Sequence, residues 1–212
     1  NIAYLKEELS VGESFDMIYR ALEYGGVKMG LFFVDGFAKD DVMVQIMHHL
    51  DAYASQQMPP HPLEQLMQRF IPYIEVAATD DLEEVITQVL SGQAALVVEG
   101  EQEAILLDVR AYPARTPEEP DMERVVRGPR DGFVETIIFN TALIRRRIRD
   151  RNLVMKYKQV GLRSKTDVVL AYMKHIADPD LVELLENKLD EIKVDGITMA
   201  EKTIEEFIFG RF

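Results

Sequence analysis

The chain has 212 residues, of which 47% are hydrophobic; this is enough to bury a core and excludes a disordered chain. It contains no cysteine, which excludes disulfides, thiolate nucleophiles and cysteine-based metal sites. The formal net charge of −13 disfavours binding to nucleic acid, and no apolar run reaches the about 20 residues needed to span a bilayer. The length suits one large α/β domain or two small ones.

The acidic total hides an uneven distribution of charge. Residues 1–121 hold 7 basic and 22 acidic side chains, a net charge of −15. Residues 122–174 hold 13 basic and 5 acidic side chains, a net charge of +8, and residues 175–212 return to −6. The basic middle is therefore a local feature of a chain that otherwise repels polyanions.

The first half predicts a sheet with helices packed against it. Residues 10–24 begin like a helix, because Ser14 could cap it and apolar residues follow at helical spacing until Gly25. The order of elements that follows, β-α-α-β-α-β-β, implies a mixed sheet. The predicted strands are 27–37, 73–80, 94–100 and 104–110, and the predicted helices are 38–54, 63–73 and 81–92.

The second half predicts a further α/β unit. Residues 112–121 hold three prolines and four charged residues, which is typical of a linker. We therefore predict two small α/β subdomains, 1–116 and 117–212, each a mixed β-sheet flanked by helices. In the second subdomain the hydrophobic spacing predicts helices at 131–149, 180–192 and 198–212 and strands at 153–161 and 167–177.

The sequence offers little support for an enzyme. It contains no nucleophile elbow, phosphate-binding loop or dinucleotide-binding loop, and its four histidines lack the spacing of metal-binding pairs. We therefore expect no catalytic residue, no metal and no cofactor. Carboxylates in or just after predicted strands leave a metal-dependent enzyme using Asp35 and Glu99 as an alternative, although turn formation explains them more simply. These carboxylates are Asp35, Glu75, Glu99 and Asp108.

Four arginines within five residues form the most unusual feature of the sequence. On a helix, Arg145 and Arg149 would share a face while their neighbours fan across the polar side, and cations near a helix C-terminus complement its dipole. The run predicts a basic patch for contact with a partner's acidic face or with anionic lipid headgroups; a solvated face paired with the acidic first half is the alternative. The predicted basic patch comprises Arg127, Arg130, Arg145, Arg146, Arg147, Arg149, Arg163 and Lys165.

Residues 127–153 and 160–185 also carry a long motif that resembles a known family. The first segment reads RGPRDGFVETIIFNTALIRRRIRDRNL, and the second contains Arg-Ser-Lys-Thr at 163–166 and Ile-Ala-Asp-Pro at 176–179. Together they resemble the GerA-type spore germination proteins, and the opening half resembles the stage V sporulation protein AF branch of that family. The matching positions in the first segment are Gly128, Pro129, Arg130, Asp131, Phe133, Glu135, Asn140, Leu143, Ile144, Arg145, Arg146 and Arg147.

The resemblance implies an N-terminal region, soluble and on the core-facing side, of an integral protein of the spore inner membrane. It implies two small α/β subdomains and a membrane domain after residue 212. The family's soluble region usually continues past this end, so the second sheet is expected to be short of strands. The implied partners are further copies of the chain, other germination membrane proteins and the membrane itself, with no nucleic acid.

The resemblance also implies a function. A-type subunits are proposed to oligomerise and to form the ion pathway that opens during germination, so we expect a domain for assembly and signal transmission that performs no chemistry. The alternative is a binding module for a small nutrient germinant held between the two subdomains. For the basic patch, we prefer contact with a neighbouring subunit's acidic first half.

Overall fold

The computed structural model describes residues 1–54, 62–70, 75–111, 132–197 and 200–210. The chain forms two compact units. Unit 1 comprises Asn1–Gly12 and Asp16–Arg151, and unit 2 comprises Glu13–Phe15 and Asn152–Phe212. The predicted α/β class, with sheets flanked by helices, is confirmed.

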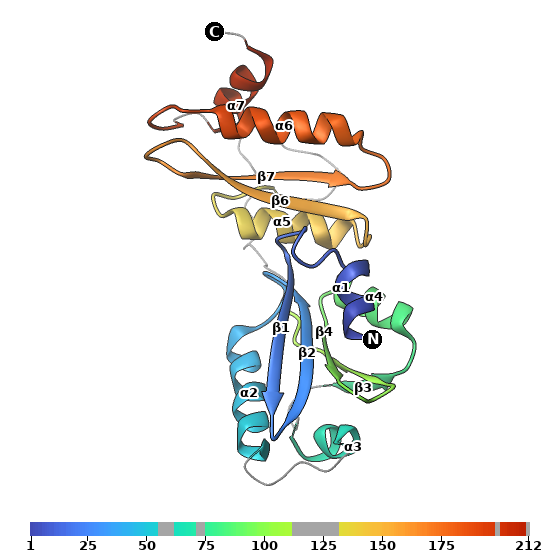
Figure 1. Ribbon diagram of the computed structural model, residues 1–212. Coiled ribbons are helices and arrows are strands. Elements are labelled where there is room, and N and C mark those ends of the chain that lie inside the picture. The colour runs from blue at the N-terminus through green and yellow to red at the C-terminus, as the bar shows by residue number, and fades with distance from the viewer. Residues whose placement is uncertain (55–61, 71–74, 112–131, 198–199, 211–212) are drawn as a thin grey trace, which may run out of the picture. The chain divides into compact units, whose positions relative to one another are not determined.

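Unit 1 is built on a five-stranded sheet in the order β1-β2-β4-β5-β3 (Figure 1). All four strand pairings are antiparallel, so the sheet is not mixed as expected. Short hairpins join β1 to β2 and β4 to β5, and a short connection can join only antiparallel neighbours. The strands are β1 (Met17–Tyr24), β2 (Val27–Val34), β3 (Val76–Thr79), β4 (Ala94–Val98) and β5 (Ala104–Leu107).

The helix expected at residues 10–24 is wrong, because most of this segment is β1. The strand pairs with β2 along its whole length, from Met17 opposite Val34 to Tyr24 opposite Val27. The two residues between the strands are glycines with φ of 57° and 78°, as a tight hairpin turn requires. Pairing with β2 therefore overrides the helical spacing of the apolar residues.

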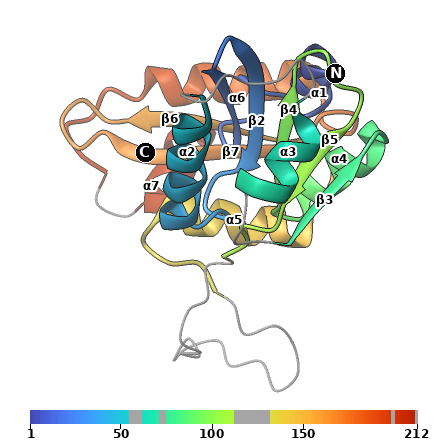
Figure 2. The same cartoon turned by 90° about the horizontal axis from the view of Figure 1, so that it is seen from below.

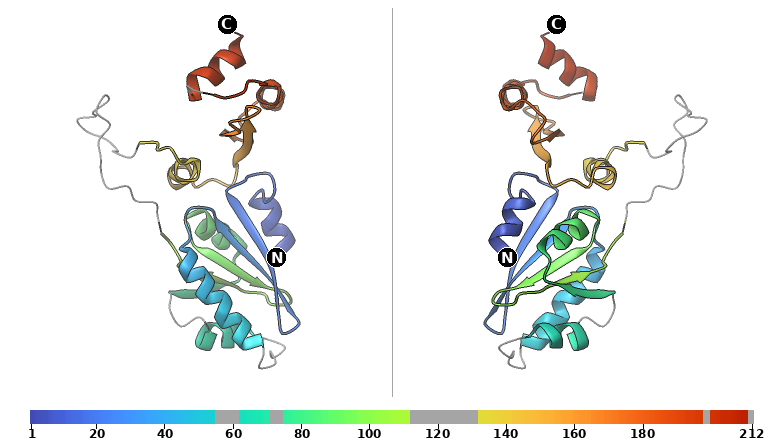
Figure 3. Two further views of the ribbon diagram at one scale, coloured as in Figure 1. Left: turned by 90° about the vertical axis from the view of Figure 1, so that its left-hand side faces the viewer. Right: turned by 90° about the vertical axis from the view of Figure 1, so that its right-hand side faces the viewer.

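Helices cover both faces of the sheet of unit 1 (Figures 1 and 3), and Figure 2 gives the same layers from below. Successive strand residues point to opposite faces, so Leu31 packs in the core under one layer and Phe32 in the core under the other. Both cores are closed to solvent. The helices are α1 (Ile2–Glu8), α2 (Asp40–Ala54), α3 (Leu63–Gln65), which continues into a π-helical turn (Leu66–Phe70), and α4 (Leu82–Leu90).

Unit 2 pairs an antiparallel hairpin with helices. A short segment from the N-terminal part of the chain also belongs to it: the Ser14 hydroxyl accepts a hydrogen bond from the Met155 amide at 3.0 Å, and the Phe15 amide donates to the Met155 carbonyl at 2.9 Å. The elements are β6 (Leu153–Val160), β7 (Thr166–Met173), α6 (Pro179–Glu191) and α7 (Ala200–Phe209).

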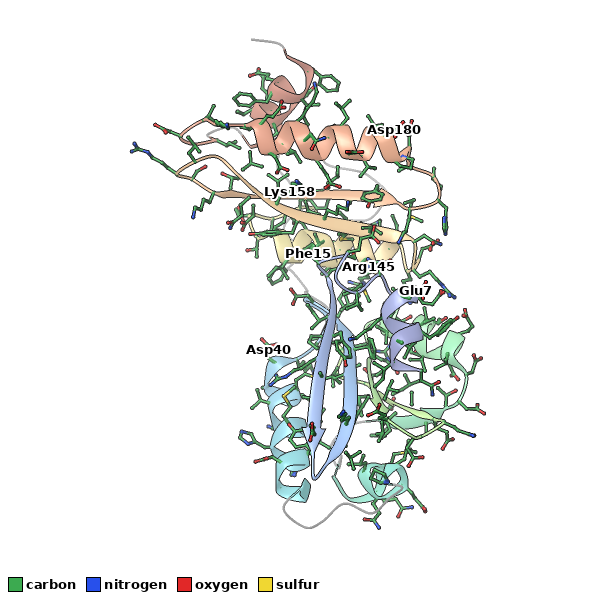
Figure 4. All side chains as sticks on the ribbon, in the orientation of Figure 1. Glu7, Phe15, Asp40, Arg145, Lys158 and Asp180 are labelled. Atoms are coloured by element: carbon green, nitrogen blue, oxygen red, sulfur yellow. The ribbon has the colours of Figure 1, made fainter. Side chains whose placement is uncertain are left out.

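Ion pairs supplement a small core in unit 2. The cluster under α6 buries Val160, Leu189 and Ile192. The ammonium of Lys158, labelled on β6 in Figure 4, lies 2.6 Å from the Asp190 carboxylate on α6. Exposed ion pairs contribute about 0–1 kcal/mol each and are screened by salt, so they add modestly to this core.

Acid is expected to weaken unit 2. The Lys174 ammonium, 2.7 Å from Glu13, donates a hydrogen bond that lowers the pKa of the Glu13 carboxyl below its ordinary value. A carboxyl with a lowered pKa stabilises the fold above its ordinary pKa, and this contribution is lost as the pH falls through the folded-state pKa. We expect Glu13→Gln to reduce the loss of thermal stability between about pH 7 and about pH 3, measured by circular dichroism. Glu183→Gln, an exposed control on α6, should leave that loss unchanged.

The boundary between the units differs from the predicted one. The structure divides the chain at Arg151/Asn152 instead of 116/117, because the helix that follows the predicted linker packs in unit 1, where Thr141, Ala142 and Arg145 are buried. The predicted linker itself, residues 112–121, lies outside the described residues. No helix in the described ranges is both long enough and apolar enough to cross a membrane.

Candidate interaction site on the arginine helix

The arginine run ends helix α5 (Ile137–Arg147), which local hydrogen bonds join to the segment before it. The Asn140 side chain makes two hydrogen bonds to the Val134 backbone. Its Oδ1 accepts from the Val134 amide and its Nδ2 donates to the Val134 carbonyl, both at 2.7 Å. The hydroxyl of Thr141 donates to the carbonyls of Ile137 and Ile138. The Asn140 bonds hold the segment before α5 against its first turn, and the Thr141 bonds lie within the helix.

Helix α5 packs closely against the turn that follows β2. Ala142 is 1% exposed and lies in the core on the α4 side of the sheet. Gly36 in the turn has a φ of 78°, and a Cβ placed there would lie 3.1 Å from Ile138 Cγ2 and 3.3 Å from Ala142 Cβ. Glycine therefore provides both the backbone conformation and the space that α5 needs.

Arg145 is buried and paired, so its predicted place on an exposed basic patch is wrong. Both Arg145 and Asp16 are 1% exposed (Figure 4 labels Arg145 on α5). The Nε donates to Asp16 Oδ2 at 2.8 Å, Nη2 donates to Asp16 Oδ1 at 3.2 Å, and Nη1 donates to the Asp150 carbonyl at 2.9 Å. A buried charge needs such partners, and the planar guanidinium matches a carboxylate in two places.

The other arginines of the run remain exposed. Arg146, Arg147 and Arg149 are exposed at the end of α5, and Arg149 Nε donates to the Arg146 carbonyl at 3.3 Å. Large apolar side chains accompany them, since Phe139 is 45% exposed and Ile148 is 41% exposed. The candidate interaction surface is therefore the exposed part of α5 and its end, residues 139 and 146–149.

The remaining members of the predicted basic patch lie in unit 2 or outside the described residues. Arg163 and Lys165 belong to unit 2, where Arg163 Nε lies 3.5 Å from Asp195 Oδ1. Arg127 and Arg130 lie outside the described residues.

Sequence reasoning missed Arg151, which follows the arginine run and connects elements of unit 1. Its Nη1 donates to Glu8 Oε2 at 2.5 Å, and Nη2 forms an ion pair with Glu83 on α4. Hydrogen bonds to these carboxylates raise the pKa of Arg151 above its ordinary value. Residue type gave no signal for this role, because the sequence does not distinguish an arginine that pairs with distant carboxylates from an exposed one.

The two carboxylates considered for a metal site lie at opposite ends of the sheet. Asp35 follows the end of β2, whereas the Glu99 amide bonds to the Lys28 carbonyl beside the start of β2. A strand of eight residues is about 23 Å long, so Asp35 and Glu99 do not converge. Position in or just after a predicted strand does not bring two carboxylates together when the strands that precede them are antiparallel neighbours.

No metal site is found among the residues that the structure describes. They contain no group of three or more histidine, aspartate or glutamate side chains that could hold an ion. His48, His49 and His175 are exposed, and His61 lies outside the described ranges. Asp108 pairs with Arg110, whose hydrogen bonds lower the pKa of that carboxyl.

Asp35 is expected to destabilise unit 1 at neutral pH. Burial raises the pKa of its carboxyl, and the negative charges of Asp40 and Asp16 also raise it. A hydrogen bond from the Gly36 amide lowers the pKa but does not cancel the rise. A carboxyl whose pKa is raised in the folded state stabilises the fold only while it is protonated. Its contribution is lost as the pH rises from the ordinary pKa through the raised pKa. Asp35→Asn should therefore raise the melting temperature at about pH 7, and this gain should shrink below about pH 4. Asp51→Asn, an exposed control on α2, should leave the melting temperature unchanged at both pH values.

Unit 1 also contains an open groove of about 960 Å³. The start of α1, the strands β1 and β2 and the turn after β4 line it, and Tyr19 lies in its wall with the Lys6 ammonium 3.7 Å from the ring centroid. Lys28, Glu23 and Glu99 add charges of both signs. The groove is therefore a second feature, separate from α5, with space for a small polar molecule.

The sequence pattern of the Bacillus/Clostridium GerA spore germination protein matches residues 3–211. The chain belongs to the GerA family. Stage V sporulation protein AF of Bacillus subtilis (strain 168) is 45% identical over 211 residues, covering 100% of this chain and 43% of that protein. Spore germination protein GerLA of Bacillus cereus is 31% identical, covering 96% of this chain and 41% of that protein. The predicted resemblance to this family and to its stage V sporulation protein AF branch is confirmed.

A solved structure of a spore germinant receptor domain supports the fold. The N-terminal domain of the A subunit of the Bacillus megaterium spore germinant receptor GerK3 matches with a TM-score of 0.70 at 20% identity, covering 92% of this chain and 71% of that one. At this identity the match shows a shared fold. The chain spans less than half the length of its GerA-family relatives stage V sporulation protein AF and GerLA.

The structure separates two roles within the GerA motif of this chain. Asn140 and Arg145 are structural, because their side chains fix the start and the docking of α5. Arg146 and Arg147 are exposed on the same helix. A single motif thus provides both the attachment of the helix and its candidate interaction surface.

Proposed function

We propose that this chain is the N-terminal region of a spore germination protein of the spore inner membrane, on the side that faces the spore core. It serves in the assembly and signal transmission of an oligomeric ion channel or receptor complex that releases ions during germination, and it performs no chemistry itself. The observation that carries the proposal is the GerA match from residue 3 to residue 211. The chain spans less than half the length of its relative stage V sporulation protein AF.

The proposed partners are further copies of the chain, other germination membrane proteins and the membrane through the rest of the protein, with no nucleic acid. Charge supports contact between copies. Exposed Arg146, Arg147 and Arg149 project from a chain whose first 121 residues carry a net charge of −15. Complementary charge on two surfaces favours association and its orientation.

Fractionation of the full-length protein from dormant spores tests its location. We expect recovery in the inner membrane, resistant to high salt and released by detergent. Recovery in the soluble fraction would contradict the membrane assignment and the channel function that depends on it.

Charge reversal tests the proposed contact. In the full-length protein, Arg146→Glu, Arg147→Glu and Arg149→Glu together should reduce the oligomer seen by cross-linking in spores and slow germination. The matched control reverses the exposed Lys39, Lys193 and Lys202, which changes the net charge equally. Equal effects of both triple variants would show that net charge matters and that the end of α5 does not.

A binding module for a small nutrient germinant is the second candidate, and the groove in unit 1 favours it. Calorimetry with candidate germinants separates the two functions. Saturable heat that is lost on Tyr19→Ala, a substitution in the groove wall, would favour the binding module. Absence of heat would leave assembly and signal transmission as the function.

A further inference from the structure

A buried cluster of unit 1 joins two of the three points at which the chain changes unit. The chain leaves unit 1 at Gly12/Glu13, re-enters it at Phe15/Asp16, which we call the entry, and leaves it again at Arg151/Asn152, which we call the exit. The first residue after the entry, Asp16, and the residue before Arg151, Asp150, are 134 positions apart in sequence. Arg145 binds both of them, through the Asp16 carboxylate and the Asp150 carbonyl.

The cluster is fixed within unit 1 on both sides. The Asp35 amide donates to the Asp16 carbonyl at 2.8 Å, which joins the entry segment to the end of β2. The Ile148 amide donates to the Ile144 carbonyl at 2.9 Å, which joins the exit segment to α5. Arg145 is the side chain that links these two hydrogen-bonded regions.

The chemistry of the link is specific to a guanidinium. Its three nitrogens lie in one plane and address two partners at once, with Nε and Nη2 on the carboxylate and Nη1 on the carbonyl. A lysine ammonium keeps the charge but cannot present this planar fork. An apolar pair of similar volume would fill the space and often retains stability, but it bonds to neither segment.

We infer that Arg145 is a positioning residue that couples the entry and exit segments of unit 1, so that displacement of one is transmitted to the other. The inference concerns a single chain and is independent of assembly or membrane attachment. It gives a buried residue of the GerA motif a role in passing movement through unit 1, distinct from the contact surface of its exposed neighbours.

Residue-resolved amide hydrogen exchange on the 212-residue chain tests the coupling. The Ile148 amide reports on the exit segment and the Asp35 amide on the entry segment. We expect Asp16→Asn to accelerate exchange at Ile148 by about tenfold or more beyond any acceleration of the β4 and β5 amides, which report global stability, and Arg145→Lys to do the same at both amides. Arg149→Lys, a nearby exposed control, should leave both amides unchanged.

Two results would overturn the inference. One is an effect of Asp16→Asn confined to the entry segment, and the other is a uniform acceleration across unit 1, which indicates global destabilisation alone. The double variant Asp16→Leu/Arg145→Met keeps the test decisive if a single variant fails to fold. We expect it to keep the cooperative unfolding of unit 1 while exchange at Ile148 stays fast; restored protection at Ile148 would show that Arg145 merely fills space and balances charge.

Discussion

Arg145→Met is expected to lower the free energy of unfolding of unit 1 by about 3–5 kcal/mol, because it leaves Asp16 buried with its charge partner removed. Asp16 is 1% exposed, so water cannot replace the guanidinium without opening the fold. The loss would be a large fraction of the stability of a domain of this size. Urea denaturation followed by circular dichroism measures it.

Two further variants show whether the missing partner is the cause. Asp16→Leu combined with Arg145→Met removes both charges and should recover most of the lost stability, since apolar replacement of a buried ion pair is often neutral. Arg149→Met, at an exposed arginine of the same run, should change the free energy of unfolding by less than about 0.5 kcal/mol. A double variant as unstable as Arg145→Met alone would assign the loss to packing.

Gly36→Ala is expected to lower the free energy of unfolding by about 2–5 kcal/mol. The backbone at this position has a φ of 78°, which costs an L-residue about 1–2 kcal/mol. The added methyl would also meet Ile138 Cγ2 at 3.1 Å and Ala142 Cβ at 3.3 Å, and overpacking of this kind costs about 1–3 kcal/mol. The measurement is again denaturation of unit 1.

Gly100→Ala is the matched control for the contact with α5. Gly100 has a φ of 90°, and a Cβ there would have nothing within 4 Å. Its substitution therefore carries the backbone cost without the packing cost. Equal losses for Gly36→Ala and Gly100→Ala would contradict the close docking of α5 against the β2 turn.

Local pattern predicted the elements whose own residues determine them. The apolar strands around Leu31 and Leu96 were predicted because strands buried on both faces read as continuous apolar runs. Helix α4 was predicted because its apolar stripe follows a capping Asp81, whose carboxylate accepts from the Glu83 amide at 2.9 Å. Both features lie within a few residues of each other in sequence.

The features that depend on distant residues were not predicted. Strand β1 read as a helix because its pairing with β2 is invisible to helical spacing, although Gly25-Gly26 was a usable hairpin signal. The position of the unit boundary depends on the packing of one face of α5 in unit 1, which the composition of residues 112–121 does not encode.

The site shows the same division between local and distant information. Exposure of Arg146 and Arg147 follows from the helical pattern of α5, whereas Arg149 is exposed beyond the end of the helix. The burial of Arg145 depends on Asp16, which lies 129 positions away. Four similar arginines in sequence therefore gave no means of separating the structural one from its exposed neighbours.

The membership of Glu13–Phe15 in unit 2 has a consequence for biosynthesis. Ser14 leaves the ribosome 141 residues before Met155, to which it bonds, a delay on the order of ten seconds at ordinary rates of translation. The sheet of unit 1, whose strands end at Leu107, can form during that delay, whereas unit 2 must wait for its last elements. No continuous stretch of the gene encodes unit 2, so a fragment that starts at residue 152 would lack one of its parts.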